Sequence, residues 1–221
     1  MRKEIKEDSI TSLTTKDFLK LRVFNDFKVD YESLIQGFKL TPPLSSNVDT
    51  KSTSIESFFV NEGFAAKQFK TICENYLSDL GLENDVILKK HTSGHYNVIS
   101  KQLSEYLLKL NTKRKSPFSD IRLYFDLSAK LSNNEKLSFL LGNYQRFYRD
   151  NMFAIISSWQ TFILMDIINS FSASDEKVKT ISHFNVPRLT QIILDDNSLL
   201  LEMLNSWRLE IDNINNNQLG E

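Results

Sequence analysis

Apolar residues recur every three or four positions along most of the chain, which is the spacing of one face of an α-helix. The clearest segment runs from Phe64 to Leu80, and Gly81 follows it at the position of a left-handed C-cap. Another helix is predicted to begin at Asn133 or Asn134, with an inner face made of Leu137, Leu140, Leu141, Tyr144, Phe147 and Tyr148. The apolar segment around Ile155, Phe162 and Ile163 follows, and we expect the two to form the centre of a core.

Shorter apolar patterns predict further helices. In the first half they are a helix that follows the cap Thr15 and contains Phe18, Leu21 and Phe24, a helix over 31–38, and a helix with apolar residues from Ile99 to Leu110. In the second half they are a helix that begins at Ser116 and Pro117, a short helix after Pro187 with Leu189, Ile192 and Ile193, and a last helix capped by Ser198. Segment 40–54 contains two prolines and predicts a loop, whereas 89–97 predicts a connection or tight hairpin. The pattern indicates an all-α chain of two small helical domains, residues 1–97 and 98–221.

Composition supports a globular chain rich in helix. The 221 residues are 41% hydrophobic and 25% charged, and 6 Gly and 4 Pro are too few for a glycine-rich cofactor fold or a turn-dense β-sandwich. The single cysteine, Cys73, allows neither an intrachain disulfide nor a cysteine-based zinc site. The first residues are acidic where a signal peptide is apolar, and polar residues interrupt the most apolar stretch, 152–171. We therefore expect a cytoplasmic protein without a membrane span.

Charge is unevenly distributed, although the net charge is only -1. Residues 1–115 sum to +3 and residues 116–221 to -4, and the most basic stretch lies between residues 86 and 115. Within it, Lys113, Arg114 and Lys115 directly precede the helix start at Ser116 and Pro117. Cations beside free backbone N–H groups suit phosphate binding, while a merely solvated basic face is the alternative reading.

The sequence contains no familiar catalytic motif. The patterns GxxxxGK[ST], GxGxxG, HExxH, GxSxG and CxxC are absent, so we expect neither an enzyme nor a bound cofactor. His91 and His95 have the spacing of a metal pair on a helix, but Ser93 and Gly94 between them favour a loop, and we interpret them as solvated histidines. We expect no metal site.

Several strings of the second half form an ordered pattern. Glu105-Tyr106 is followed by the basic stretch, then by Phe118-Ser119-Asp120-Ile121-Arg122, and later by residues 155–166, IISSWQTFILMD. This series resembles the replicative helicase loader, or helicase assembly protein, of T-even-type phages. The match is thinner in the first half, where Phe58-Phe59 precedes the long helix that starts near Phe64.

The resemblance implies an all-helical protein whose N-terminal domain is similar to an HMG box and binds duplex DNA. It implies an accessory role in DNA replication and recombination: binding forked and single-stranded DNA, contacting the single-stranded-DNA-binding protein, and loading the hexameric replicative helicase without ATP hydrolysis. A phage-encoded chain would act in the cytoplasm of the host cell. That family is strongly basic, so a net charge of -1 predicts weaker and more salt-sensitive DNA binding.

Candidate phosphate contacts follow from this hypothesis. They are Lys89, Lys90, Lys101, Lys113, Arg114 and Lys115, with Lys16, Lys20, Arg22, Lys67 and Lys70 as candidates in the N-terminal domain. The competing hypothesis is a helical scaffold for protein–protein interaction, whose lysines only add solubility and whose acidic second half docks a partner. Basic residues gathered on one face would favour DNA, and basic residues dispersed around the molecule would favour the scaffold.

Overall fold

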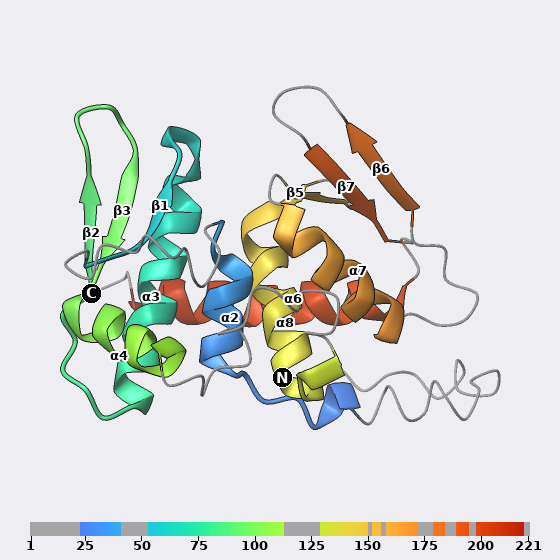
Figure 1. Cartoon of the computed structure of the whole chain (residues 1–221), viewed down its shortest axis with the longest axis horizontal. Coiled ribbons are helices and arrows are strands. Elements are labelled where there is room, and N and C mark those ends of the chain that lie inside the picture. Colours follow the sequence, from blue (N-terminus) through green and yellow to red (C-terminus); the bar gives the residue numbers. More distant parts are fainter. Residues whose placement is uncertain are drawn as a thin grey trace.

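A computed structural model describes residues 23–40, 53–112, 129–149, 152–155, 158–171, 179–183, 189–194 and 198–218. In this part of the chain, helices pack together with two antiparallel sheets (Figure 1). The prediction of an all-α fold is therefore wrong. The expectation of an HMG-box-like N-terminal domain is wrong as well, because the first half contains a three-stranded sheet.

The first half carries a β-hairpin between two of its helices. Its elements are α2 (Tyr31–Phe38), β1 (Ser54–Phe58), the 3-10 turn η2 (Val60–Glu62), α3 (Gly63–Asp79), β2 (Ile87–Lys90), β3 (Tyr96–Ile99) and α4 (Lys101–Thr112). The sheet order is β1-β3-β2. The predicted hairpin over 89–97 is confirmed: His91 N–H donates to the His95 carbonyl (2.8 Å), and Gly94 adopts φ +86°. Ile99, predicted as helical, ends β3 instead.

The second half carries a four-stranded sheet. Its elements are α6 (Asn133–Phe147), β4 (Tyr148–Arg149), β5 (Met152–Ile155), α7 (Ser158–Phe171), β6 (Lys179–His183), β7 (Leu189–Ile193) and α8 (Leu199–Gln218). The sheet order is β4-β5-β7-β6. The short helix predicted over Leu189 to Ile193 is wrong, because this segment pairs with both β5 and β6. Tyr148 and Ile155 likewise lie in strands.

Other predicted helices match the structure. The predictions for α2, α3, α6 and α8 are confirmed, and Gly81 follows α3 with φ +65°. Ser132 begins α6 with a capping box: its hydroxyl accepts from the Glu135 N–H, and the Glu135 carboxylate accepts from the Ser132 N–H. The Thr15 helix up to Leu21, the Ser116–Pro117 helix start and most of the 40–54 loop lie outside the described residues.

Apart from η2 and β4, the described parts of the two halves share one order of elements: helix, strand, helix, two-stranded hairpin, helix. The sheets agree too, since β1-β3-β2 and β5-β7-β6 place corresponding strands at corresponding positions. The first helices of the two repeats, α2 and α6, also carry similar sequences, SLIQG at residues 33–37 and SFLLG at residues 138–142. Described residues of both halves share one hydrophobic core. The domain boundary predicted after residue 97 falls within β3 and stays a prediction.

Helices α2 and α6 cross in close contact at one glycine from each. A Cβ on Gly37 would lie 2.0 Å from the Phe139 carbonyl oxygen, and a Cβ on Gly142 would lie 2.1 Å from the Leu34 carbonyl oxygen. The contact is reciprocal, because Leu34 and Phe139 precede the two glycines by the same three positions. Only glycine permits this approach of two backbones.

Candidate nucleic-acid interface

Two of the candidate lysines lie on the β2–β3 hairpin. Lys89 and Lys90 are exposed residues at the end of β2, an edge strand, and neighbouring positions on a strand point to opposite faces. Lys90 pairs across the hairpin with Tyr96, and its ammonium lies 5.4 Å from the centroid of the Tyr96 ring. This geometry is that of a cation–π contact, which fixes the position of the charge.

Two further candidate lysines lie on the α3 face that contacts this hairpin. That face is formed by residues at helical spacing, namely Gly63, Lys67, Lys70 and Glu74. At one end of this face, a Cβ on Gly63 would lie only 3.0 Å from the Tyr96 hydroxyl oxygen, so the helix and the hairpin are in close contact there. At the other end, the Asn84 amide donates to the Glu74 carboxylate at 3.0 Å. Lys67 and Lys70 lie on α3 between these two contacts, of which only the one at Gly63 is with the hairpin, since Asn84 precedes β2. Lys70 also forms an ion pair with Glu74 at 2.5 Å.

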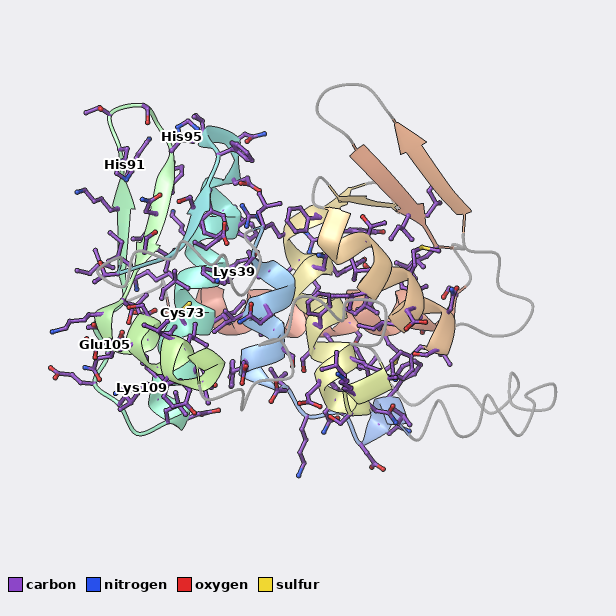
Figure 2. The ribbon with its side chains drawn as sticks, viewed as in Figure 1. Lys39, Cys73, His91, His95, Glu105 and Lys109 are labelled. Atoms are coloured by element: carbon purple, nitrogen blue, oxygen red, sulfur yellow. The ribbon has the colours of Figure 1, made fainter. Side chains whose placement is uncertain are left out.

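Lys101 does not join this group. It is the first residue of α4, and α4 lies at the opposite end of the hairpin from its turn; Figure 2 shows His91 and His95 near the turn and Glu105 and Lys109 on α4. The carboxylate of Asp85 accepts the Lys101 and Gln102 N–H groups at 2.9 and 3.0 Å. The N-terminus of α4 thus already holds an anionic group of the chain.

The Asp85 carboxylate also accepts a hydrogen bond from the Ser100 hydroxyl. Partial burial by itself raises the pKa of Asp85, but the hydrogen bonds from Ser100 and the α4 N–H groups outweigh it, and the pKa lies below its usual value. Lys113, Arg114, Lys115, Lys16, Lys20 and Arg22 lie outside the described residues.

A buried arginine, which sequence analysis did not single out, anchors the segment beside the hairpin turn. Arg146 of α6 is 1% exposed, and its guanidinium donates to both carboxylate oxygens of Glu62 at 3.0 Å. It also donates to the carbonyls of Phe38 (2.9 Å) and Ser57 (3.1 Å), and Glu56 lies 3.5 Å away. One side chain therefore ties α6 to α2, β1 and η2. In the sequence, Arg146 follows Gln145 in a segment that mixes polar and apolar residues, and no feature of this segment marks Arg146 as buried.

Burial shifts the pKa of both Cys73 and the neighbouring Lys39, and it makes the Cys73 thiol unreactive. Burial raises the pKa of the Cys73 thiol well above its usual range, so the thiol stays protonated. Burial lowers the pKa of Lys39, and the charge of Glu56 opposes that shift. Both side chains lie between α2 and α3, away from the hairpin turn (Figure 2). We assign them to packing.

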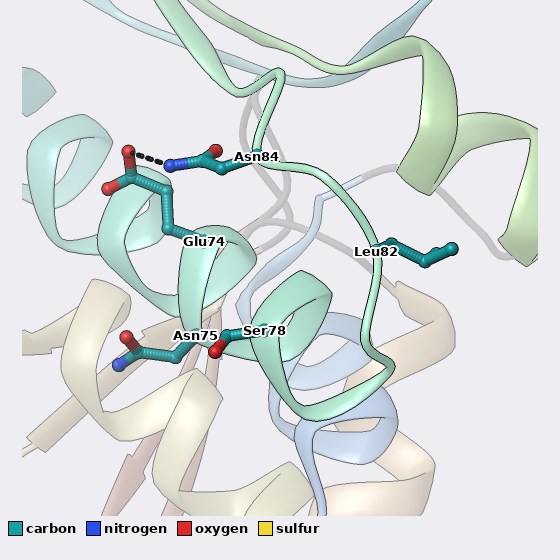
Figure 3. A pocket seen from close by; sticks show the side chains of 5 residues that line it. All are labelled: Glu74, Asn75, Ser78, Leu82 and Asn84. Carbon is teal, nitrogen blue, oxygen red and sulfur yellow. Dashed lines mark hydrogen bonds between the residues drawn. The ribbon is translucent and has the colours of Figure 1, made fainter.

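The described residues contain a polar depression of about 440 Å³ along the second half of α3. It is lined by Glu74, Asn75, Ser78, Leu82 and Asn84, and Figure 3 shows the Asn84–Glu74 hydrogen bond at its edge. Lys70 and Asn84 both engage the Glu74 carboxylate, so this side chain is held within the fold.

Within the described residues, the side chains offer no metal site and the helices no membrane span. No cluster of three His, Cys, Asp or Glu side chains there could hold a metal ion. Among the described helices, none combines the length and apolar character needed to cross a bilayer.

No protein-family model, no curated protein and no solved structure matches the chain. Four candidate lysines lie on two packed elements, α3 and the hairpin, and one of them, Lys90, contacts the Tyr96 ring. Exposed lysines attract phosphate groups.

Proposed function

We propose that the chain is an accessory protein of DNA replication that binds forked and single-stranded DNA and loads the hexameric helicase without hydrolysing ATP. One observation carries the DNA-binding part: Lys67, Lys70, Lys89 and Lys90 lie on the facing elements α3 and β2–β3. We infer the two protein partners, the helicase and the single-stranded-DNA-binding protein, from the resemblance of residues 105–176 to helicase loaders.

Charge in this region supports phosphate contact. Segments 57–70 and 87–97 contain these four lysines and one acidic residue, Glu62. Glu74, four residues after Lys70, forms an ion pair with it, so Lys67, Lys89 and Lys90 supply the charge that favours phosphate. The Glu62 carboxylate is bound by Arg146, so it does not offset the lysines. Phosphate contacts of this kind position a protein on DNA without reading the sequence. The second half, at -4, is the half we assign to protein partners.

The test is binding of the purified chain to a fork, a linear duplex and a single strand of equal length, each titrated with salt. We expect preference for the fork and an affinity that falls as salt rises. Replacing Lys89 and Lys90 together by alanine should lower the salt slope by about two at most. Lys28→Ala with Lys130→Ala is the matched control, because both lysines are exposed and lie on segments away from the hairpin. No binding to any of the three DNAs at low salt would refute DNA contact.

The second candidate function is a protein-interaction scaffold. The observation in its favour is that Phe59, Val60 and Phe64 are exposed apolar side chains close together in sequence. A chain that binds no DNA, or whose Lys89 and Lys90 variant binds as the wild type does, would leave the scaffold as the better account.

A further inference from the structure

An exposed apolar cluster lies beside the hairpin turn. Phe59, Val60 and Phe64 are 48%, 56% and 61% exposed, and they account for three of the five exposed large apolar residues in the described part of the chain. We call these three residues the aromatic tip. Large apolar groups gathered at one place on a surface mark a binding site more often than scattered ones do.

The backbone of the aromatic tip is fixed from within the protein. Glu62 accepts the Phe59 N–H at 2.8 Å, and the same carboxylate is held by the buried Arg146. Arg146 also binds the Ser57 carbonyl, just before Phe59 along the chain. A buried ion pair is costly to desolvate, and here it orders a turn whose side chains face solvent. Exposed rings on an immobilised backbone are pre-organised for a ligand.

The β2–β3 hairpin lies against the aromatic tip. If Gly94 carried a Cβ, that atom would lie 3.2 Å from the Val60 methyl carbons. The centroids of the Phe59 and His95 rings are 6.1 Å apart. Lys67 lies three residues after Phe64 on the surface of α3, so the two are neighbours on the helix. Exposed rings and lysines therefore both occur on the packed elements η2, α3 and the hairpin.

We propose that the aromatic tip binds the unpaired bases of a single strand, with Phe59 and Phe64 stacking on bases and Lys67, Lys89 and Lys90 contacting the phosphates. This inference rests on the proposed DNA binding. Charge complementarity selects the ligand, because a single strand presents flat apolar faces and an anionic backbone together. The bases of a duplex are already stacked on one another, so the rings have no face to bind there.

The experiment measures the affinity of the full chain for a 16-nucleotide thymidine strand, an abasic strand of equal length and a duplex of equal length. Phe59→Ala and Phe64→Ala should each weaken binding to the thymidine strand by about fivefold to a hundredfold. Affinity for the abasic strand and the duplex should stay within about twofold of wild type, and the salt slopes should not change, because all lysines remain. Ile87→Ala is the matched control, since Ile87 is 60% exposed but lies at the far end of β2 from the turn.

Substitutions at Phe64 separate stacking from general apolar contact. Phe64→Trp should preserve binding to the thymidine strand, whereas Phe64→Leu should weaken it almost as much as alanine does. The inference is overturned if the alanine variants bind the thymidine strand as well as wild type, if they lose duplex binding equally, or if leucine replaces phenylalanine without loss. In each of these cases, salt-dependent DNA binding by the wild type would still support the proposed function. A wild type that binds no DNA would refute both the proposed function and this inference.

Discussion

Replacing Gly142 by alanine tests the contact between α2 and α6. The new Cβ would lie 2.1 Å from the Leu34 carbonyl oxygen and 3.0 Å from the Phe38 nitrogen, and both are backbone atoms that cannot rotate away. The two helices must separate, which also disturbs the bond from Arg146 to the Phe38 carbonyl (2.9 Å).

The magnitude follows from three opposing contributions. Overpacking costs about 1–3 kcal/mol, and weakening a charged hydrogen bond costs about 1.5–3 kcal/mol. The better helix propensity of alanine returns about 0.5–1 kcal/mol. We therefore expect a net loss of about 2–5 kcal/mol in the free energy of unfolding, or a fall in Tm of about 4–20 °C for a chain of this size.

The assay is urea unfolding followed by helical circular dichroism and by the fluorescence of the two tryptophans, of which Trp207 packs against Phe24 and Phe27. Gly81→Ala is the control: its φ of +65° strains alanine, but no atom lies within 4 Å of the new Cβ, so the cost should be about 1 kcal/mol. A loss for Gly142→Ala no greater than that for Gly81→Ala would refute the close crossing. Adding Gly37→Ala should cost less than its single effect, because the helices are already apart.

Three other predictions concern buried or capping groups. Arg146→Met should lower the free energy of unfolding by about 3–5 kcal/mol, since it leaves buried carboxylates without a counterion; Glu62→Gln in the same chain should recover part of the loss in urea unfolding. Cys73 should react with a disulfide reagent at pH 8 only when the chain unfolds, because burial raises the pKa of its thiol; rapid labelling of the native chain would contradict this. The pKa of Asp85 is lowered by folding, so its contribution to stability is present above the unfolded pKa and is lost as pH falls through the folded pKa. The stability difference between wild type and Asp85→Asn should therefore shrink in acid, and a difference that grows would contradict the capping role.

Helices with long apolar faces could be predicted from the sequence, whereas most of the strands could not, the turn between β2 and β3 being the exception. The α3 and α6 patterns extend over four turns, which leaves little ambiguity about the period. The segment Leu189 to Ile193 has apolar residues at helical spacing and follows a proline, so its local pattern favours a helix start. Pairing with β5 and β6 overrides that preference, and a five-residue strand has too few positions to show alternation.

The candidate interface was predictable only in part. The sequence identifies Lys89 and Lys90 as neighbours, but Lys67 and Lys70 join them through the packing of α3 on the hairpin, which is a tertiary contact. Arg146 gives no signal, because a polar residue within a helix is by default assigned to solvent. The sequence does not mark Phe59 and Phe64 as exposed, and their exposure depends on where η2 places them.

The reciprocal crossing of α2 and α6 has the geometry of an isologous dimer interface, in which a surface meets a copy of itself. Because both helices belong to one polypeptide, their association does not depend on protein concentration. The two halves that meet at this contact carry opposite net charges, +3 for residues 1–115 and -4 for residues 116–221. Two oppositely charged halves thus meet through a reciprocal contact, and the two glycines are the residues that permit its close approach.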